Sequence, residues 1–371
     1  RFEFFPAVSL GWLVSNEKFF EPLSDVVSSL KLRGSYGLVG SDETGPSNAP
    51  HFLYIDQVQV TGNGRPGFTT GENLNVSYYG PVVQQWAVQN GGWERVKKLD
   101  VGFDMELFRE LSITFDFFYD KRYNILLHRE AWPQSLGFHE AKPWSNKGKV
   151  DNWGYEVSTN WRKQLTKDLT VDFRGTFTYT QNKYIDVDEP IYPYVWQTAT
   201  GKPLNRRNGY IAEGLFQSQE EIDNAPEQNF GTYRVGDVRY RDVNGDGVVD
   251  TYDKVALGYT NIPEITYGFG LTAQWRSWDI NAFFQGIAHC TFYIGGTAMR
   301  PFSTGNINQS AINADIYDHV WKTTNTPEQN QAAYYPRLSE AGGEGSTNNN
   351  QTSTLTMRDG RFLRLKNFEI G

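Results

Sequence analysis

Apolar and polar residues alternate with a period of two over several long segments of the chain. Successive side chains of a β-strand point to opposite faces, so this alternation predicts strands with one apolar and one polar face. In segment 99–107, for example, Leu99 and Val101 share one face, and Asp100 and Asp104 share the other. The same alternation recurs at 111–120, 169–179, 265–276 and, more weakly, 153–162.

Two all-β architectures produce such strands. A soluble sandwich turns its apolar faces to a core, but its strands are usually about five or six residues long. The segments here are longer, which suits tilted strands that cross a bilayer and carry charges on a water-filled side. Aromatic residues gather near the strand ends, as in the girdles of membrane barrels, although aromatics also favour strands in general.

Short and long connections alternate along the chain. The turns at 108–110, 163–168 and 276–277 are short, whereas the connections at 128–147, 186–263 and 295–354 are long. Transmembrane barrels have short periplasmic turns and long extracellular loops, so this alternation favours a barrel. We therefore predict nine spanning strands, at 2–14, 29–40, 94–108, 111–127, 148–163, 168–183, 264–276, 278–294 and 361–371.

Smaller features complete this prediction. Segments 52–60 and 73–80 are expected to form an extra hairpin, and "EKFFEPLSDVVSSL" a turn with a short helix. An open run of nine strands would leave two bare edges. The chain also opens directly on "RFEFFPAVSLGW", and its first methionine is Met105. We therefore expect a fragment, with the other barrel strands in the rest of a longer protein.

The composition and the motifs argue against several classes of function. The chain of 371 residues has 15% aromatic residues and a net charge of −8, which with the lack of a basic run argues against a nucleic-acid partner. Its single cysteine, Cys290, excludes an internal disulfide. The formal GxGxxG match "GNGRPG" at 62–67 is followed by no helix that would receive a phosphate, and no hydrolase or zinc motif occurs. We predict that the chain is not an enzyme.

The acidic stretch "RDVNGDGVVDTYDK" matches a calcium-binding loop of the EF-hand type at 242–253. Gly247 occupies the sixth position, where the loop turns sharply, and Asp replaces the usual Glu at position twelve, which predicts weaker binding. Its flanks suggest loop and strand instead of two helices. The alternative is an acidic turn without an ion. The predicted oxygen ligands are Asp242, Asn244, Asp246, Val248 through its carbonyl, Asp250 and Asp253.

Aromatic residues in the long connections are candidates for substrate contact, because sugars stack on aromatic rings and peptides also use aromatic anchors. The sequence does not decide between these two substrate classes. The candidates are Trp86, Trp132, Trp144, Tyr194 and Trp196, together with Tyr192 and Trp321.

Several stretches of the chain resemble stretches in the C-terminal part of SusC-like TonB-dependent outer-membrane transporters, and they follow one another in the same order. They include "LKLRGSYGLVGSDE", "GDVRYRDVNGDGVVD", "YGFGLTAQWRSWDINAFFQG", "YYPRLS" and "RDGRFLRLKNFEIG". The resemblance implies that residues 1–371 supply strands twelve to twenty of a 22-stranded barrel, with 186–263 as a long extracellular loop and without the N-terminal plug. It also implies a SusD-like lid lipoprotein, the TonB complex and outer-membrane lipid as partners, and is compatible with a dimer of transporter–lipoprotein pairs.

The function implied by the resemblance is import of oligosaccharides or peptides across the outer membrane of a Gram-negative bacterium. Two alternatives stay open at this point. One is a secreted, calcium-stabilised β-rich protein that binds or degrades glycans, which would need a suitably spaced carboxylate pair for hydrolysis. The other is a dockerin-like scaffold protein, which would need a second calcium repeat and helices.

Overall fold

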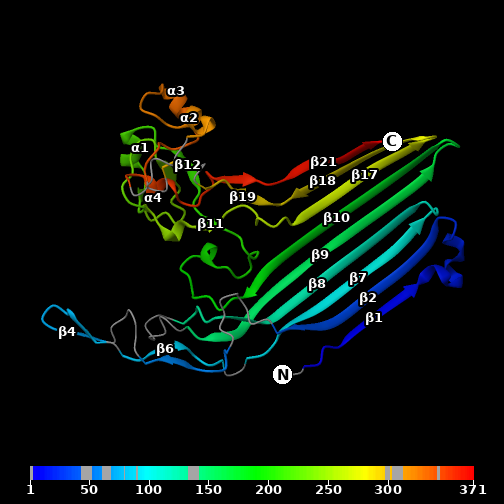
Figure 1. Ribbon diagram of the computed structural model, residues 1–371, viewed down its shortest axis with the longest axis horizontal. Coiled ribbons are helices and arrows are strands. Elements are labelled where there is room, and N and C mark those ends of the chain that lie inside the picture. Colours follow the sequence, from blue (N-terminus) through cyan, green and yellow to red (C-terminus); the bar gives the residue numbers. More distant parts are fainter. Residues whose placement is uncertain are drawn as a thin grey trace.

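A single curved sheet of nine antiparallel strands dominates the computed structural model (Figure 1). The structure describes residues 3–42, 52–60, 68–78, 80–88, 91–132, 142–296, 301–302, 312–340 and 343–371. Within these residues the large sheet has the order β1-β2-β7-β8-β9-β10-β17-β18-β21, so each wall strand pairs with the next wall strand along the chain. Its strands are β1 Ala7–Leu13, β2 Val27–Ser41, β7 Glu94–Leu107, β8 Leu111–His128, β9 Trp144–Gln164, β10 Leu169–Asp186, β17 Ile265–Trp275, β18 Trp278–Ala288 and β21 Phe362–Ile370.

The register of the sheet separates apolar from polar residues on its two faces. Across β7, β8 and β9, Phe103 pairs with Phe115 and Phe115 with Val157, whereas on the opposite face Asp104 pairs with Thr114 and Thr114 with Ser158. Stacked rings reinforce the apolar face, because cross-strand aromatic pairs stabilise a sheet. The ring centroids lie 5.5 Å apart in Phe103–Phe115, 6.4 Å in Phe115–Tyr155, 5.9 Å in Tyr155–Phe177 and 5.1 Å in Phe269–Phe284.

Apolar side chains on this face remain open to their surroundings. Leu32, Val101, Leu271, Ile280 and Leu363 are between 41 and 54% exposed. Soluble proteins rarely leave so extended an apolar surface uncovered, whereas a barrel wall turns it to lipid. None of Phe103, Phe117 and Phe269 is buried, so no sealed interior forms on that side.

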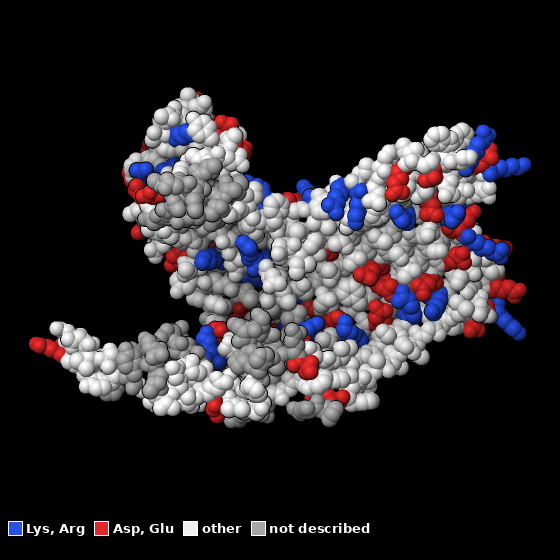
Figure 2. Space-filling model, in the orientation of Figure 1, with Lys and Arg blue, Asp and Glu red and all other residues white. Residues whose placement is uncertain are grey.

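The opposite face is polar and carries charged side chains over the half nearer the short turns (Figure 2). On β2, Arg33 lies among three carboxylates of this face, 2.5 Å from Asp116, 3.3 Å from Asp104 and 3.8 Å from Asp100. Phe283 is an apolar exception on this face. Its ring lies close above Gly268 and Gly270, where any Cβ would approach it to about 3 Å, and Arg174 stacks on it at 4.9 Å.

The long connections gather at one end of the sheet (Figure 1). Parts of two of them, 208–263 and 312–359, fold together into a unit that we call the head. Its elements are β11 Asn208–Gly209, β12 Ala212–Leu215, α1 Gln219–Asn224, β13 Glu227–Gln228, β14 Val238–Tyr240, β15 Val248–Val249, η5 Thr251–Asp253, β16 Val255–Ala256, α2 Ala314–His319, α3 Pro327–Ala332, α4 Ser346–Asn349 and β20 Met357–Asp359, which pairs with β19 Thr291–Tyr293 outside the head.

The predicted wall strands agree with the structure to within a few residues at most ends, with two corrections. The strand expected at 278–294 ends at Ala288, because His289 adopts a left-handed φ of +51° and the chain leaves the wall to form β19. The hairpin expected between 52–60 and 73–80 is wrong. Instead β3 Gln57–Gln59 pairs with β6 Val82–Gln85, and β4 Phe68–Thr70 pairs with β5 Val76–Tyr78.

Two short 3-10 helices, η1 Val14–Asn16 and η2 Lys18–Leu23, fill the turn in which one helix was expected. No helix in the described ranges is long and apolar enough to cross a membrane. The "GNGRPG" stretch at 62–67 lies outside the described residues.

Candidate functional site

The head has a hydrophobic core of its own. Tyr210, Leu215, Val238, Tyr240 and Val249 are buried together, and Trp321 and Leu355 from the second connection pack against them. Trp321 is therefore partly enclosed by the head's own core. The two long connections thus form one packed unit above the end of the wall.

Buried polar side chains join the two connections. The Gln228 amide donates to Asn348 Oδ1 at 2.7 Å and accepts the Tyr240 N–H at 2.6 Å. Asp237, which is 0% exposed, lies 2.8 Å from Arg337 Nε and accepts a hydrogen bond from Asn349 at 2.8 Å. Burial raises the pKa of Asp237, and its bonds to Asn349 and Arg337 counteract that shift in part.

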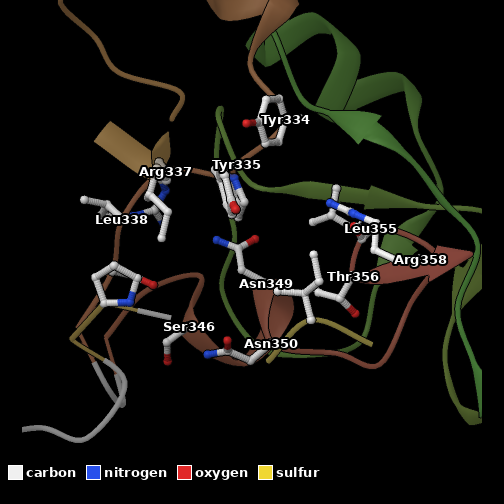
Figure 3. Close-up of a pocket in the computed structure, with 15 residues that line it drawn as sticks. Tyr334, Tyr335, Arg337, Leu338, Ser346, Asn349, Asn350, Leu355, Thr356 and Arg358 are labelled. Atoms are coloured by element: carbon white, nitrogen blue, oxygen red, sulfur yellow. Dashed lines mark hydrogen bonds between the residues drawn. The ribbon is translucent and has the colours of Figure 1, made fainter. Parts of the chain in front are cut away.

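A cavity of about 90 Å³ lies beside this network, between residues 334–339 and 346–358 (Figure 3). Its walls are largely apolar, with polar side chains between them. Tyr334 borders the cavity, and the hydrogen bond from its hydroxyl to Asp315 raises the pKa of Tyr334 to about 12. The cavity was not predicted from the sequence. "YYPRLS", quoted above only for its resemblance, supplies residues 334–339 of its lining, so this motif is the sequence signal that could have pointed to the cavity.

The acidic loop at 242–253 closes on its own backbone. Asp253 is fully buried and accepts the N–H groups of Val243 at 2.7 Å, Asn244 at 3.2 Å and Asp250 at 2.8 Å. Asp242 accepts the N–H groups of Gly245 and Gly247, both of which have positive φ. These contacts bring the start and the end of the loop together.

The side chains of three other predicted ligands also accept backbone N–H groups of the loop. Asn244 accepts the N–H of Asp246, Asp246 accepts that of Val248, and Asp250 accepts that of Tyr252. Oxygen donors of this kind suit a hard cation such as calcium. In the described part of the chain, however, no three His, Cys, Asp or Glu side chains are gathered closely enough to hold a metal ion. Calcium binding therefore stays a prediction.

Two of the aromatic candidates lie against this loop. Tyr194 precedes the 3-10 helix η4 Val195–Gln197 and Trp196 lies within it; their rings stack with centroids 4.6 Å apart and planes 11° apart. Trp196 Nε1 donates to the carbonyl of Tyr252 at 2.8 Å, and the Tyr252 ring lies 6.0 Å from that of Tyr194. The structure thus brings together an aromatic surface and the acidic loop, which the sequence had suggested separately. The candidate Tyr192 is partly open to solvent, at 36% exposure.

The other aromatic candidates lie apart from this cluster. Trp144 is 8% exposed, its ring centroid lies 3.7 Å from that of His128, and it packs with Leu126, so little of its ring is open to a ligand. The Trp132 ring lies 5.2 Å below the guanidinium of Arg129. Trp86 is more open, at 39%.

Known proteins agree with this architecture. No protein-family model matches the chain. TonB-dependent receptor P26 of Formosa agariphila is 27% identical over 382 residues, which cover 100% of this chain and 35% of the receptor. TonB-dependent receptor SusC of Bacteroides thetaiotaomicron is 26% identical over 296 residues, which cover 76% of this chain and 27% of SusC. These matches confirm the resemblance to SusC-like TonB-dependent receptors.

A solved structure shows the same fold for nearly the whole chain. The RagAB peptide importer in its open-open state matches with a TM-score of 0.67 and 19% identity, over 99% of this chain and 36% of that chain. This likeness shows a shared fold, and together with the matches to TonB-dependent receptors it supports the outer-membrane β-barrel predicted from the sequence. The chain spans about a third of the length of the curated relatives it matches.

Proposed function

We propose that the chain forms part of the wall and extracellular surface of a TonB-dependent importer for oligosaccharides or peptides. A SusD-like surface lipoprotein would cover the end that carries the head, and the TonB complex would supply energy through regions outside this chain. The head and the aromatic cluster would contact arriving cargo. The chain itself performs no covalent chemistry in this proposal.

The observation that carries this proposal is the division of the sheet into two faces. An exposed apolar face with stacked aromatics suits lipid, and a polar face with Arg33 among three carboxylates suits a water-filled lumen. A secreted glycan-binding protein would have to cover the apolar face, and the described residues provide no second layer for it. A dockerin would need helices beside the acidic loop, which is preceded by β14 and ends in η5.

We also propose that the loop at 242–253 binds calcium. Its role would be structural, because Tyr252 lies in this loop and also contacts both Tyr194 and Trp196. An ion held by Asp242, Asn244 and Asp246 would stiffen the turn that supports the aromatic cluster. Extracellular calcium sites work at weak affinity, on the order of 10⁻⁴–10⁻³ M, because the ion is plentiful outside cells.

Fractionation and uptake test the importer directly. The full-length protein should sediment with outer membranes, need detergent for extraction and retain a lipoprotein during affinity purification. Deletion of its gene, or of tonB, should abolish uptake of the same labelled oligosaccharide or peptide. Recovery of the full-length protein as a soluble monomer would contradict the proposal.

A further inference from the structure

The cavity beside Tyr334 and Tyr335 has the size of one aliphatic side chain (Figure 3). Its volume is about 90 Å³, whereas an engineered apolar cavity that binds benzene measures about 150 Å³. A pyranose ring with its hydroxyl groups is larger than benzene and exceeds this volume, so an aliphatic side chain suits the small cavity better. Ile316, Leu338 and Leu355 supply apolar walls, which favour an apolar group over a polar one.

A positive charge stands at the wall of this cavity. Arg358 Nη1 donates to the carbonyls of Leu355 and Met357, both at 2.8 Å. In the described ranges no carboxylate lies within ion-pair distance of Arg358. The neighbouring Asp359 pairs instead with Arg361 at 2.9 Å. Arg337, the other cation of the lining, is neutralised by Asp237. The cavity therefore presents one uncompensated cation beside an apolar pocket.

A second, more open hollow adjoins the first. It has a volume of about 590 Å³ and is also lined by Tyr334, Leu355 and Arg358, which border both spaces. Its lining also includes Glu213, whose carboxylate is paired with Arg241 at 2.8 Å. A ligand with an apolar group in the small cavity can place an anionic group at Arg358 and continue into the larger hollow.

We propose that the small cavity binds the apolar side chain at the carboxyl end of a peptide, with the terminal carboxylate facing Arg358. The rest of the peptide then lies in the adjoining hollow. A charge-assisted hydrogen bond from a guanidinium to a carboxylate is stronger than a neutral one, so the free carboxyl end is the feature that is read. This inference rests on the proposed import function and assigns peptides, instead of oligosaccharides, to this site.

Titration calorimetry on the detergent-solubilised full-length transporter, isolated with any lipoprotein bound to it, tests the assignment. The probes are acetyl-Ala-Ala-Leu with a free carboxylate, the same peptide with a carboxyl-terminal amide, and maltoheptaose. Wild-type protein should bind the acid at least tenfold more tightly than the amide. Arg358→Gln should remove that preference and leave amide binding unchanged. Arg361→Gln, an exposed arginine three residues away, should bind both peptides as the wild type does.

A second variant tests the cavity itself. Leu338→Trp should fill the space and weaken binding of both peptides at least tenfold, with the protein still in the outer membrane. The assignment is overturned if the wild type binds neither peptide, or if Arg358→Gln keeps the preference for the acid. It is also overturned if Arg358→Gln weakens maltoheptaose binding, or if the variants lower thermal stability alone because the chain itself fills the cavity. In each of these cases TonB-dependent uptake by the wild type would still stand as a separate result.

Discussion

Asp237 and Arg337, which are 100 positions apart in the chain, form a buried ion pair between the two long connections. Arg337 Nη2 also donates to the carbonyl of Glu344 at 2.8 Å, and Gly345 lies so close that any Cβ there would approach the Asp237 carboxylate to 2.5 Å. The pair therefore ties the second connection to the residue that precedes β14 in the first. It makes the head one unit instead of two independent loops.

Asp237→Asn should loosen the head, because it leaves the Arg337 guanidinium buried without its counter-charge. Breaking a buried pair in this way costs about 3–5 kcal/mol. Hydrogen exchange on the full-length transporter should then show faster exchange of the amides in 228–240 and 346–353. Glu344→Gln is the matched control, since it removes the exposed Arg234–Glu344 pair at 3.3 Å. Exposed pairs contribute about 0–1 kcal/mol, so equal effects of the two variants would contradict the account.

Val157→Arg and Ser158→Arg should differ sharply in barrel assembly. The two residues are neighbours on β9, so they lie at nearly the same depth but on opposite faces of the sheet. A cation on the lipid face near the middle of the bilayer costs about 2–4 kcal/mol, whereas a lumen-facing cation stays in water. Heat-modifiable mobility of the folded barrel on gels measures assembly. Equal yields of folded protein would mean that the faces are assigned wrongly.

Calcium should protect segment 186–263 from proteolysis in the full-length transporter, and chelation by EGTA should remove that protection. Combined Asp242→Ala and Asp246→Ala substitutions should abolish the difference between the two conditions, because they remove two of the predicted ligands. Glu220→Ala with Asp223→Ala removes the same charge from the nearby helix α1 and should leave the calcium effect intact. Cleavage that is identical with calcium and with EGTA in the wild type would reject the ion.

Acid should weaken the contacts of Asp188 with Arg129 and Lys147, which form a junction between the ends of β8, β9 and β10. Burial would raise the pKa of Asp188, but hydrogen bonds from Lys147 and Arg129 outweigh burial and lower it. A lowered folded-state pKa stabilises the junction above the unfolded value of about 3.9, and this stabilisation is lost as the pH falls through the folded-state value. The protection of the amides at 187–189 against hydrogen exchange, relative to their intrinsic rates at each pH, should therefore fall below about pH 4. Asp188→Asn should show low protection at every pH, whereas wild-type protection that stays constant through this pH range would contradict the assignment.

Periodicity was enough to predict the wall. On β17, for example, Leu271 and Ala273 lie on the apolar face, whereas Thr272 between them lies on the polar face and pairs with Asn281. Such residues alternate because each strand meets lipid on one side and water on the other along its whole length. Strand ends were predicted less closely: β9 begins at Trp144, earlier than the predicted 148, in a stretch with two register shifts opposite β8.

The head was not predictable in the same way. Its strands have two to four residues, too few for a period to appear, and its core joins Tyr240 to Asn348 across 108 positions. The prediction of Trp144 as a ligand contact considered residue type alone and could not anticipate that Leu126 and His128 would cover it. The pairing of Trp196 with Tyr252 likewise depends on a contact between residues 56 positions apart.

The most direct test of the central claim is accessibility along β8 in the full-length transporter in lipid vesicles. Single cysteines at positions 113 to 118, in a Cys290→Ala background, would each carry a nitroxide label for relaxation by oxygen and by a water-soluble nickel complex. The account predicts strict alternation, with positions 113, 115 and 117 relaxed by oxygen and positions 114, 116 and 118 by nickel. Equal oxygen and nickel relaxation at adjacent positions, or protection of 113, 115 and 117 from both reagents, would contradict a wall between lipid and water.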